Sequence, residues 1–362
     1  FEVPKDKIAM TTRAIYDCRN INARIPRPPQ FQLVRPDDLL TMLATFKHPF
    51  VAKLDFRHAF YQIRLPRDCE RMFSLKCLVG DELRAFSSLV LPMGFSFSTC
   101  LQQCYASVMT YSFPGDKEDD PFIFIGPGGD GKVPPPYVAV YKKVPNGKPV
   151  HVGFCVVYYD DVAIIASSKL VRSKLVDRLL TNAKNCGAVL KEVKGKPGEH
   201  VEYFEKEGKL LGLEYNLNRG RERKVISWRH ADVEQWGDLL EAGDVERAKR
   251  LARMVGVVVW SATLHGSGML PIEDIIEMLS SRKIQDSAAG WRTLVTLLQP
   301  EKERWLEAVT EIVEKNEWSE RPVRPAPEPK RAFVSSDASN THWAGTWHSD
   351  DGVLLHSVME RW

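Results

Sequence analysis

The sequence lacks the cysteine and histidine spacing of a zinc site or a disulfide framework. Its seven cysteines are odd in number, form no C-x-x-C pair and are not matched by a regular Cys/His pattern. Several lie in apolar runs, where a free cysteine packs as a small hydrophobic side chain. We therefore expect neither structural zinc nor disulfides, and a reducing compartment.

Long apolar runs and a strong charge imbalance are also missing. No stretch approaches the length of a membrane span, and no signal peptide is recognisable, so we expect an intracellular protein, cytoplasmic or nuclear. The 50 basic and 47 acidic residues give a net charge of +3, which neither requires nor excludes a nucleic-acid partner. The length of 362 residues predicts two or three domains. Because the chain begins with Phe1, we expect a piece of a larger polyprotein or multidomain chain.

Two adjacent carboxylates stand between two apolar runs at residues 154–167, FCVVYYDDVAIIAS. The β-branched and aromatic residues on both sides predict two buried strands. Nothing flexible separates the strands, so Asp160 and Asp161 are predicted at the tight turn of a hairpin. An Asp-Asp pair taken alone is more often an ordinary solvated turn.

A third carboxylate, Asp55, ends the predicted strand 50–56. A single Asp at a strand end usually caps or turns the chain. Asp55 therefore belongs to a site only if the fold brings it to Asp160 and Asp161. The other expected elements are helices at 37–46, 98–110, 168–185, 244–264, 271–281 and 302–315, and strands at 72–79, 83–91 and 209–215.

Two segments rich in Pro and Gly interrupt this pattern. Residues 111–150 are expected to be an inserted loop with some strand near 137–143. Within it, 126–132 matches the start of a phosphate-binding loop, but Val133 and three prolines follow, so we reject that site. Residues 319–331 are expected to be a linker, followed at 332–362 by a strand meander too short for an independent domain.

The order of the motifs resembles the reverse transcriptases of retroviruses and retrotransposons, of the LTR or tyrosine-recombinase type. Tyr158 to Asp161 matches Y-x-D-D, and 54–60 (LDFRHAF) is similar to the first palm motif. Residues 13–22 resemble the fingers motif, and 91–98 resemble the LP-x-G segment. Residues 211–213 resemble the primer-grip hairpin, 253–260 the thumb helix, and 336–339 the first strand of RNase H. Cys18, Met93 and Thr99 depart from the family pattern.

The resemblance covers nearly the whole chain and implies an α+β right-hand polymerase of fingers, palm and thumb, with an antiparallel palm sheet backed by helices. Fingers and palm are expected at 1–218, with 111–150 inserted in the palm, and the thumb or connection at 219–318. The linker would be 319–331, and 332–362 the truncated start of an RNase H domain. Only Asp337 of the RNase H carboxylates is present, so we expect no RNase H activity.

The function implied by the resemblance is DNA synthesis on RNA and DNA templates. Its partners would be an RNA template, a DNA primer, an RNA/DNA hybrid and dNTPs, with no membrane. Two Mg²⁺ ions, or Mn²⁺ as a substitute, would be held by Asp55, Asp160 and Asp161. Asp160 is expected to be the more direct ligand, and Asp161 to act mainly through its charge.

Further roles follow from the resemblance alone. Phe60 would exclude a nucleotide 2′-hydroxyl, and one lysine of Lys191, Lys194 and Lys196 would protonate the pyrophosphate. The dNTP contacts would come from Arg13, Phe56, Phe60, Met93 and Tyr159, and the primer and template contacts from Gly212, Gly256 and Trp260.

Two alternatives remain open. The first is a polymerase fold that binds nucleic acid without catalysis. Loss of a carboxylate would have favoured it, and all three are present. The second is a viral RNA-dependent RNA polymerase, which Phe60 and the Tyr158-Tyr159 pair disfavour.

Overall fold

The computed structural model divides the chain into two compact units, Phe1–Pro322 and Val323–Trp362. Each unit is described by itself. The structure describes residues 2–6, 11–14, 16–29, 31–111, 120–126, 135–145, 147–216, 225–230, 243, 245–265, 273–280, 292–315, 319–322, 333–338, 342–348 and 354–361.

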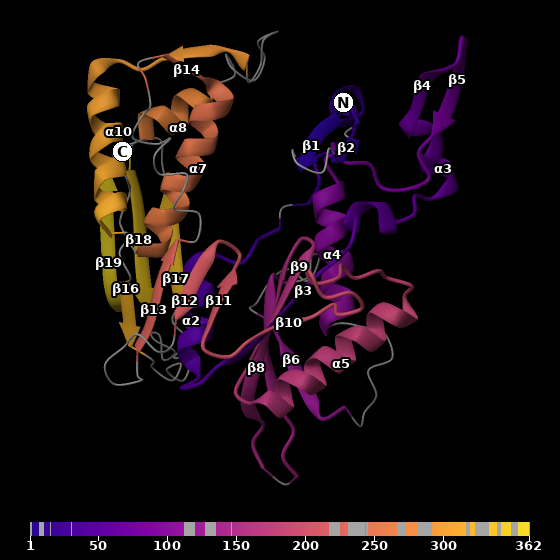
Figure 1. Ribbon diagram of the computed structural model, residues 1–362. Coiled ribbons are helices and arrows are strands. Elements are labelled where there is room, and N and C mark those ends of the chain that lie inside the picture. The colour runs from indigo at the N-terminus through magenta and orange to yellow at the C-terminus, as the bar shows by residue number, and fades with distance from the viewer. Residues whose placement is uncertain are drawn as a thin grey trace. The chain divides into compact units, whose positions relative to one another are not determined.

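The larger unit contains a six-stranded antiparallel sheet (Figure 1). Its strands, in spatial order, are β10 (Glu202–Phe204), β3 (Phe50–Asp55), β9 (Asp161–Ala166), β8 (Val150–Tyr158), β7 (Tyr137–Lys142) and β6 (Phe122–Ile125). The predicted hairpin at 154–167 is confirmed as β8 and β9, and the predicted strand ending at Asp55 is confirmed as β3.

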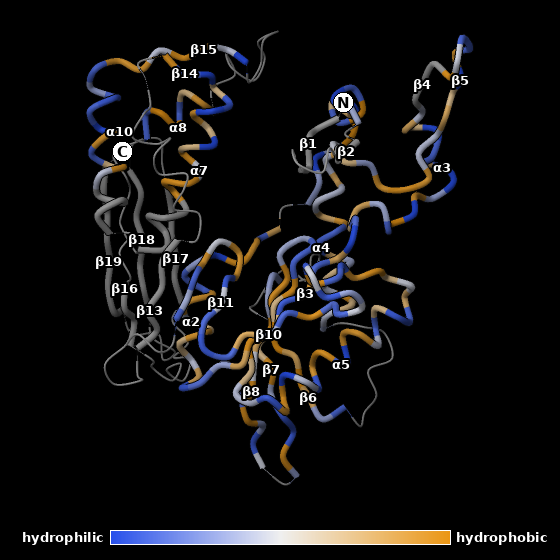
Figure 2. Tube along the Cα trace, in the orientation of Figure 1, coloured by the Kyte–Doolittle hydropathy of each residue, from blue (hydrophilic) through white to orange (hydrophobic). Residues whose placement is uncertain are grey.

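Two helices contact each other and the sheet, and they bury one of its faces. They are α4 (Ser98–Tyr111) and α5 (Lys169–Asn185), both close to their predicted bounds. Figure 2 shows hydrophobic and hydrophilic stretches alternating along α5, as expected for a helix with one buried face. Side chains of a strand alternate between the two faces of its sheet. Because Ala52 and Leu54 pack in the cluster under the helices, Lys53 and Asp55 belong to the opposite face.

The insertion at 111–150 differs from the expected loop, because it adds two strands to this sheet. The strand expected near 137–143 is confirmed as β7, but β6 was not predicted. The four apolar residues of β6 pair with β7, and an ion pair from Asp120 to Arg178 of α5 holds the chain just before β6. So short a strand between Pro and Gly residues carries no readable periodicity. Most of the rejected phosphate-loop segment lies outside the described residues.

The elements before and after β3 are mostly short. They are β1 (Glu2–Asp6), β2 (Thr11–Ala14), α1 (Arg19–Asn22), α2 (Pro36–Thr45), η1 (Ala59–Gln62), α3 (Arg67–Glu70), η2 (Arg71–Phe73), β4 (Ser74–Val79) and β5 (Glu82–Ser87). The predicted helix at 37–46 is confirmed as α2, which Pro36 starts and Asp38 caps by accepting the Arg35 N–H at 3.1 Å. The predicted strand pair around Gly80 is confirmed as β4 and β5.

After the six-stranded sheet, three predictions at 209–247 and 319–322 were wrong in detail. The single strand expected at 209–215 is a hairpin, β11 (Glu207–Leu210) and β12 (Leu213–Asn216). Its turn has positive φ at Leu211 (48°) and Gly212 (82°), the second of which glycine readily supplies. The helix expected from 244 begins only at Ala248, because β14 (Val245–Arg247) pairs with β15 (Leu294–Thr296). The expected linker cannot begin at 319, because β16 (Ser319–Pro322) pairs with β13 (Val225–His230).

The rest of the larger unit is a small helical cluster. Its helices are α7 (Ala248–His265), α8 (Glu273–Ser280) and α10 (Gln299–Lys315), and they pack around the fully buried Trp305. The smaller unit is an antiparallel meander, as predicted, of β17 (Phe333–Ala338), β18 (His342–His348) and β19 (Leu354–Arg361). Within the described ranges, no helix combines the length and hydropathy needed to cross a membrane.

Candidate active site

The pairing of β3 with β9 brings the three predicted carboxylates to one edge of the sheet. The register runs from Phe50 opposite Ala166 to Asp55 opposite Asp161. Partners in an antiparallel ladder lie roughly 4.5 to 5.5 Å apart between Cα atoms. Asp160 lies in the adjoining turn, where its backbone C=O accepts the Phe56 N–H at 2.9 Å. Asp55 therefore lies beside Asp160 and Asp161, as a role in one common site requires.

A buried glutamine holds the turn that carries Asp160. Tyr159 has a φ of 55°, a left-handed conformation that is uncommon for a residue with a side chain. Gln103 of α4 is 0% exposed, and its Oε1 accepts the Tyr159 N–H at 2.9 Å. Its Nε2 donates to the Val157 C=O at 3.0 Å. Gln103 thus fixes both sides of the turn from the helix layer, and the sequence analysis did not identify it.

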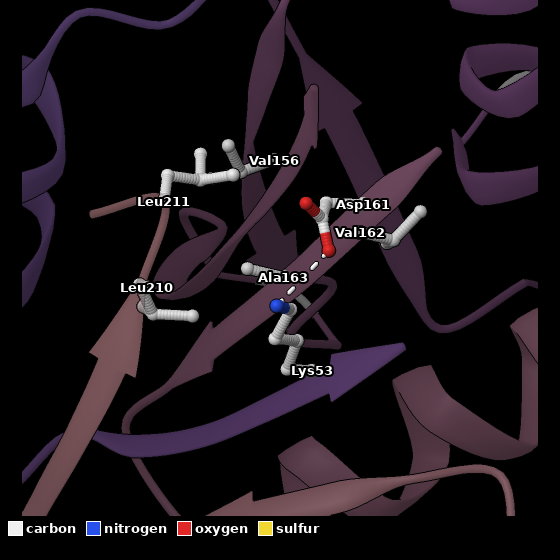
Figure 3. A pocket seen from close by; sticks show the side chains of 7 residues that line it. All are labelled: Lys53, Val156, Asp161, Val162, Ala163, Leu210 and Leu211. Atoms are coloured by element: carbon white, nitrogen blue, oxygen red, sulfur yellow. Dashed lines mark ion pairs between the residues drawn. The ribbon is translucent and has the colours of Figure 1, made fainter. Parts of the chain in front are cut away.

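Two lysines neutralise two of the carboxylates. Lys53 Nζ lies 3.0 Å from Asp161 Oδ1, and this ion pair is the dashed line in Figure 3. Lys191 Nζ lies 2.5 Å from Asp55 Oδ2. The hydrogen bond to Asp55 is the largest of the effects that raise the pKa of Lys191, and the charges of Asp55, Asp161 and Asp160 add to it, while partial burial opposes them. The sequence did not predict a role for Lys53, because a lysine inside an apolar strand has no recognisable function until the position of Asp161 on the neighbouring strand is known.

Lys191 reaches the site because its backbone is tied to the end of β3. The Lys191 N–H donates to the Asp55 C=O at 2.8 Å, and Leu190 forms a β-bridge with Phe56. The Gln62 side chain clamps this segment from the other side, donating to the Val189 C=O and accepting the Val189 N–H, both at 2.8 Å. Of the three lysines considered in the sequence, the structure pairs Lys191 with a site carboxylate.

A small pocket lies beside the Lys53–Asp161 pair, between the sheet and the turn of the β11–β12 hairpin (Figure 3). It is lined by Lys53, Val156, Asp161, Val162, Ala163, Leu210 and Leu211. Gly212 follows Leu211 in that turn. The residue expected to contact the primer thus lies one position from the pocket that Asp161 lines.

Two of the residues expected to contact nucleotide lie in neighbouring segments. Phe60 of η1 packs partly buried against a cluster that includes Cys18 and Leu91. The Leu91 N–H donates to the Ile63 C=O at 2.9 Å, so the segment leading to Met93 runs beside the one that follows Phe60. The Met93 C=O accepts the Tyr16 N–H at 3.0 Å.

The remaining expected contacts are less direct. The Phe56 ring is 2% exposed in the core under the helices, so a nucleotide contact from Phe56 can come only from its backbone. Arg13 belongs to β2, and its side chain lies outside the described part of the structure. Gly256 and Trp260 lie on α7 and not on the carboxylate-bearing sheet. Gly256 is exposed, and an added Cβ would have no atom within 4 Å.

The carboxylate set suits magnesium, which takes hard oxygen ligands and usually only one or two protein carboxylates beside substrate phosphates. Asp55 and Asp161 are ladder partners, and Asp160 is adjacent. Among the described residues, no group of three or more His, Cys, Asp or Glu side chains is arranged to hold a metal by itself. The oxygen donors of Asp55, Asp160 and Asp161 are of the kind that magnesium takes, but the structure does not arrange them as a complete coordination shell.

A comparison with protein families decides the relationship. The model of the family described as "Reverse transcriptase (RNA-dependent DNA polymerase)" matches residues 3–215, which include the three carboxylates and Gly212. The chain belongs to the reverse transcriptase family. The family predicted from the sequence is confirmed, whereas the type of element and the RNase H start stay predictions.

Solved structures of reverse transcriptases share the fold. Three solved structures of foamy viral protease-reverse transcriptase match at 13%, 14% and 14% identity, with TM-scores of 0.52, 0.50 and 0.53. The first, called dRH, and the second are complexes with double-stranded DNA, and the third is a complex with an RNA/DNA hybrid. The matches cover 99%, 100% and 100% of this chain but only 50%, 60% and 39% of those chains. The predicted α+β polymerase fold is confirmed. No curated protein matches the sequence.

Proposed function

We propose that this reverse transcriptase chain extends a primer 3′ end with deoxynucleotides on RNA and DNA templates. The observation that carries the proposal is the ladder register of Asp55 with Asp161, with Asp160 in the adjoining turn, on the face of the sheet that the helices leave uncovered. Neighbouring carboxylates favour bound cations, as the ammonium groups on Asp55 and Asp161 illustrate.

The proposed mechanism is an in-line phosphoryl transfer. Asp55, Asp160 and Asp161 would hold two Mg²⁺ ions, for which Mn²⁺ could substitute. When bound, such ions activate the primer hydroxyl and stabilise the charge on the leaving pyrophosphate. Gln103 keeps Asp160 and Asp161 in place through the backbone of the turn, and the Lys53 ammonium fixes the Asp161 carboxylate.

The proposed substrates are a primer annealed to RNA or DNA, and dNTPs. Structural relatives bound to double-stranded DNA and to an RNA/DNA hybrid support a duplex partner. Arg13, Met93 and Tyr159 would contact the dNTP, and Phe60 would exclude a 2′-hydroxyl by a steric clash. Gly212, Gly256 and Trp260 would contact primer and template, where glycine allows close approach of a backbone.

The proposed domain division keeps fingers and palm at 1–218 and the thumb or connection at 219–318. Because β16 pairs with β13, the linker would begin after Pro322. The meander of β17, β18 and β19 is in keeping with the start of an RNase H domain, which stays a prediction.

Primer extension tests this function. The purified chain is incubated with Mg²⁺, four dNTPs and a labelled DNA primer on an RNA or a DNA template, and omission of the template is the control. We expect template-dependent extension on both. Duplex binding without extension would instead support the binding-module alternative, and a preference for ribonucleotides would support an RNA polymerase.

A further inference from the structure

The two ammonium groups at the site are held in different ways. Lys53 is in the middle of the sheet on β3, its side chain is 27% exposed, and it lines the pocket beside Asp161. Lys191 is in the segment after α5, and its side chain is 59% exposed. Its backbone is hydrogen-bonded to Asp55, and its ammonium pairs with the Asp55 carboxylate from a side chain that is otherwise largely exposed. The Lys53 ammonium is therefore partly enclosed by the sheet, whereas the Lys191 ion pair is more open to solvent.

We propose that Lys191 is an exchangeable counter-cation of Asp55, whose ammonium competes with a divalent ion for Asp55 Oδ2 and so sets the affinity of the site for that ion. This inference rests on the proposed function, since it concerns the same carboxylates. It assigns Lys191 a positioning role through Asp55 and not a chemical step.

The competition follows from the contact itself. The Lys191 ammonium lies 2.5 Å from Asp55 Oδ2. Magnesium binds a carboxylate oxygen at about 2.0 to 2.1 Å. A divalent ion on that oxygen would lie within a few ångströms of the ammonium, where like charges repel strongly. The two cations therefore compete for this oxygen.

The Lys191 ammonium can dissociate from the Asp55 carboxylate at low cost. A lysine ammonium is a compact, strongly hydrated charge on a flexible four-carbon stem, so water replaces the carboxylate at little cost. An exposed ion pair of this kind changes an equilibrium constant by up to about fivefold. The backbone hydrogen bond from the Lys191 N–H to the Asp55 C=O keeps the side chain beside the site during the exchange. The hydrogen bond from the Val189 N–H to the Gln62 side chain holds the same segment. The ammonium can therefore return when the ion departs.

A titration with Mn²⁺ alone tests the exchange. Free Mn²⁺ is measured by electron paramagnetic resonance on the full 362-residue chain, without nucleotide or nucleic acid. We expect Lys191→Met to lower the Kd about two- to fivefold. Lys191→Arg keeps the charge and should stay within about twofold of the unmodified chain. Lys184→Met removes the same charge from an exposed position on α5 and should also leave the Kd unchanged.

A second measurement needs no substitution. The amine of Lys191 is acetylated with a limiting reagent and quantified by mass spectrometry, with and without Mn²⁺. We expect Mn²⁺ to increase the modification of Lys191 relative to that of Lys184.

The outcomes separate two failures. If the chain binds Mn²⁺ and extends a primer, but Lys191→Met leaves the Kd unchanged or raises it, the exchange is refuted and the polymerase function stands. Equal labelling of Lys191 with and without Mn²⁺ refutes the exchange in the same way. If no variant binds Mn²⁺ and no primer is extended, both the exchange and the proposed function are wrong.

Discussion

Replacing Gln103 with leucine tests whether the turn that carries Asp160 is held from the helix layer. The substitution keeps the approximate volume of the side chain and removes both hydrogen bonds, the one from the Tyr159 N–H and the one to the Val157 C=O. We expect a loss of stability and of turnover together, because the same two bonds support the fold and place the carboxylates.

The magnitude follows from the burial of the groups left behind. Gln103 and Val157 are both 0% exposed, and a buried backbone group without a partner costs about 1 to 3 kcal/mol. The left-handed conformation of Tyr159 itself costs about 1 to 3 kcal/mol and persists only while its surroundings enforce it. The leucine recovers part of this through apolar burial, about 1 to 2 kcal/mol. We expect a net destabilisation of about 1 to 3 kcal/mol.

The neighbouring Gln102 supplies a matched control. It is also 0% exposed, but its amide atoms have no hydrogen-bond partner among the described residues. Gln102→Leu should therefore be neutral or stabilising. Urea unfolding gives the free energy of unfolding of both variants. Primer extension gives kcat, which we expect to fall on the order of 10²-fold in Gln103→Leu only, the effect of a displacement near 1 Å. The reasoning fails if Gln103→Leu is as stable and as active as Gln102→Leu.

Three further predictions concern the insertion, pH and nucleotide choice. Asp120→Ala breaks the mostly buried pair with Arg178 and should lower the free energy of unfolding by about 3 to 5 kcal/mol. An unchanged urea midpoint would show that this pair does not anchor β6. Burial lowers the pKa of His151, despite its contact with the Gly153 C=O, so protonation favours the unfolded chain. The contribution of neutral His151 to the free energy of unfolding should therefore be complete above the unfolded pKa of about 6.5 and decline as the pH falls below it. Urea denaturation between pH 7.5 and 5.5 should show a smaller pH dependence of that free energy for His151→Gln. The same pH dependence in both proteins would contradict this. Phe60→Val should increase ribonucleotide incorporation relative to deoxynucleotides in single-nucleotide extension, and unchanged selectivity would remove Phe60 from that role.

The elements that carry the carboxylates could be predicted because their signals are local. The apolar runs around Asp160 and Asp161 specify a hairpin, and the strand before Asp55 is equally clear. That these two pieces are neighbours was implied by the resemblance and is seen in the register of Asp55 with Asp161. Local patterning predicts strands well, whereas pairing between strands a hundred residues apart depends on the tertiary fold.

The supporting residues could not be predicted for the same reason. Gln103, Gln62 and Lys53 are ordinary polar residues whose roles depend on backbone or carboxylate partners distant in sequence. The strand β6 is too short to show a periodicity, and β16 was hidden by the charged Pro-rich composition that suggested a linker. In each case a tertiary contact decided what the local sequence left undetermined.

The most direct test of the account compares Asp160→Asn with the unmodified chain in one experiment that follows both duplex binding and primer extension. The substitution keeps the shape of the side chain and removes its charge. We predict that the variant still binds an RNA template annealed to a DNA primer but adds no deoxynucleotide in the presence of Mg²⁺, while the unmodified chain extends the primer. Equal extension by both proteins would contradict the assignment of Asp55, Asp160 and Asp161 as the catalytic carboxylates.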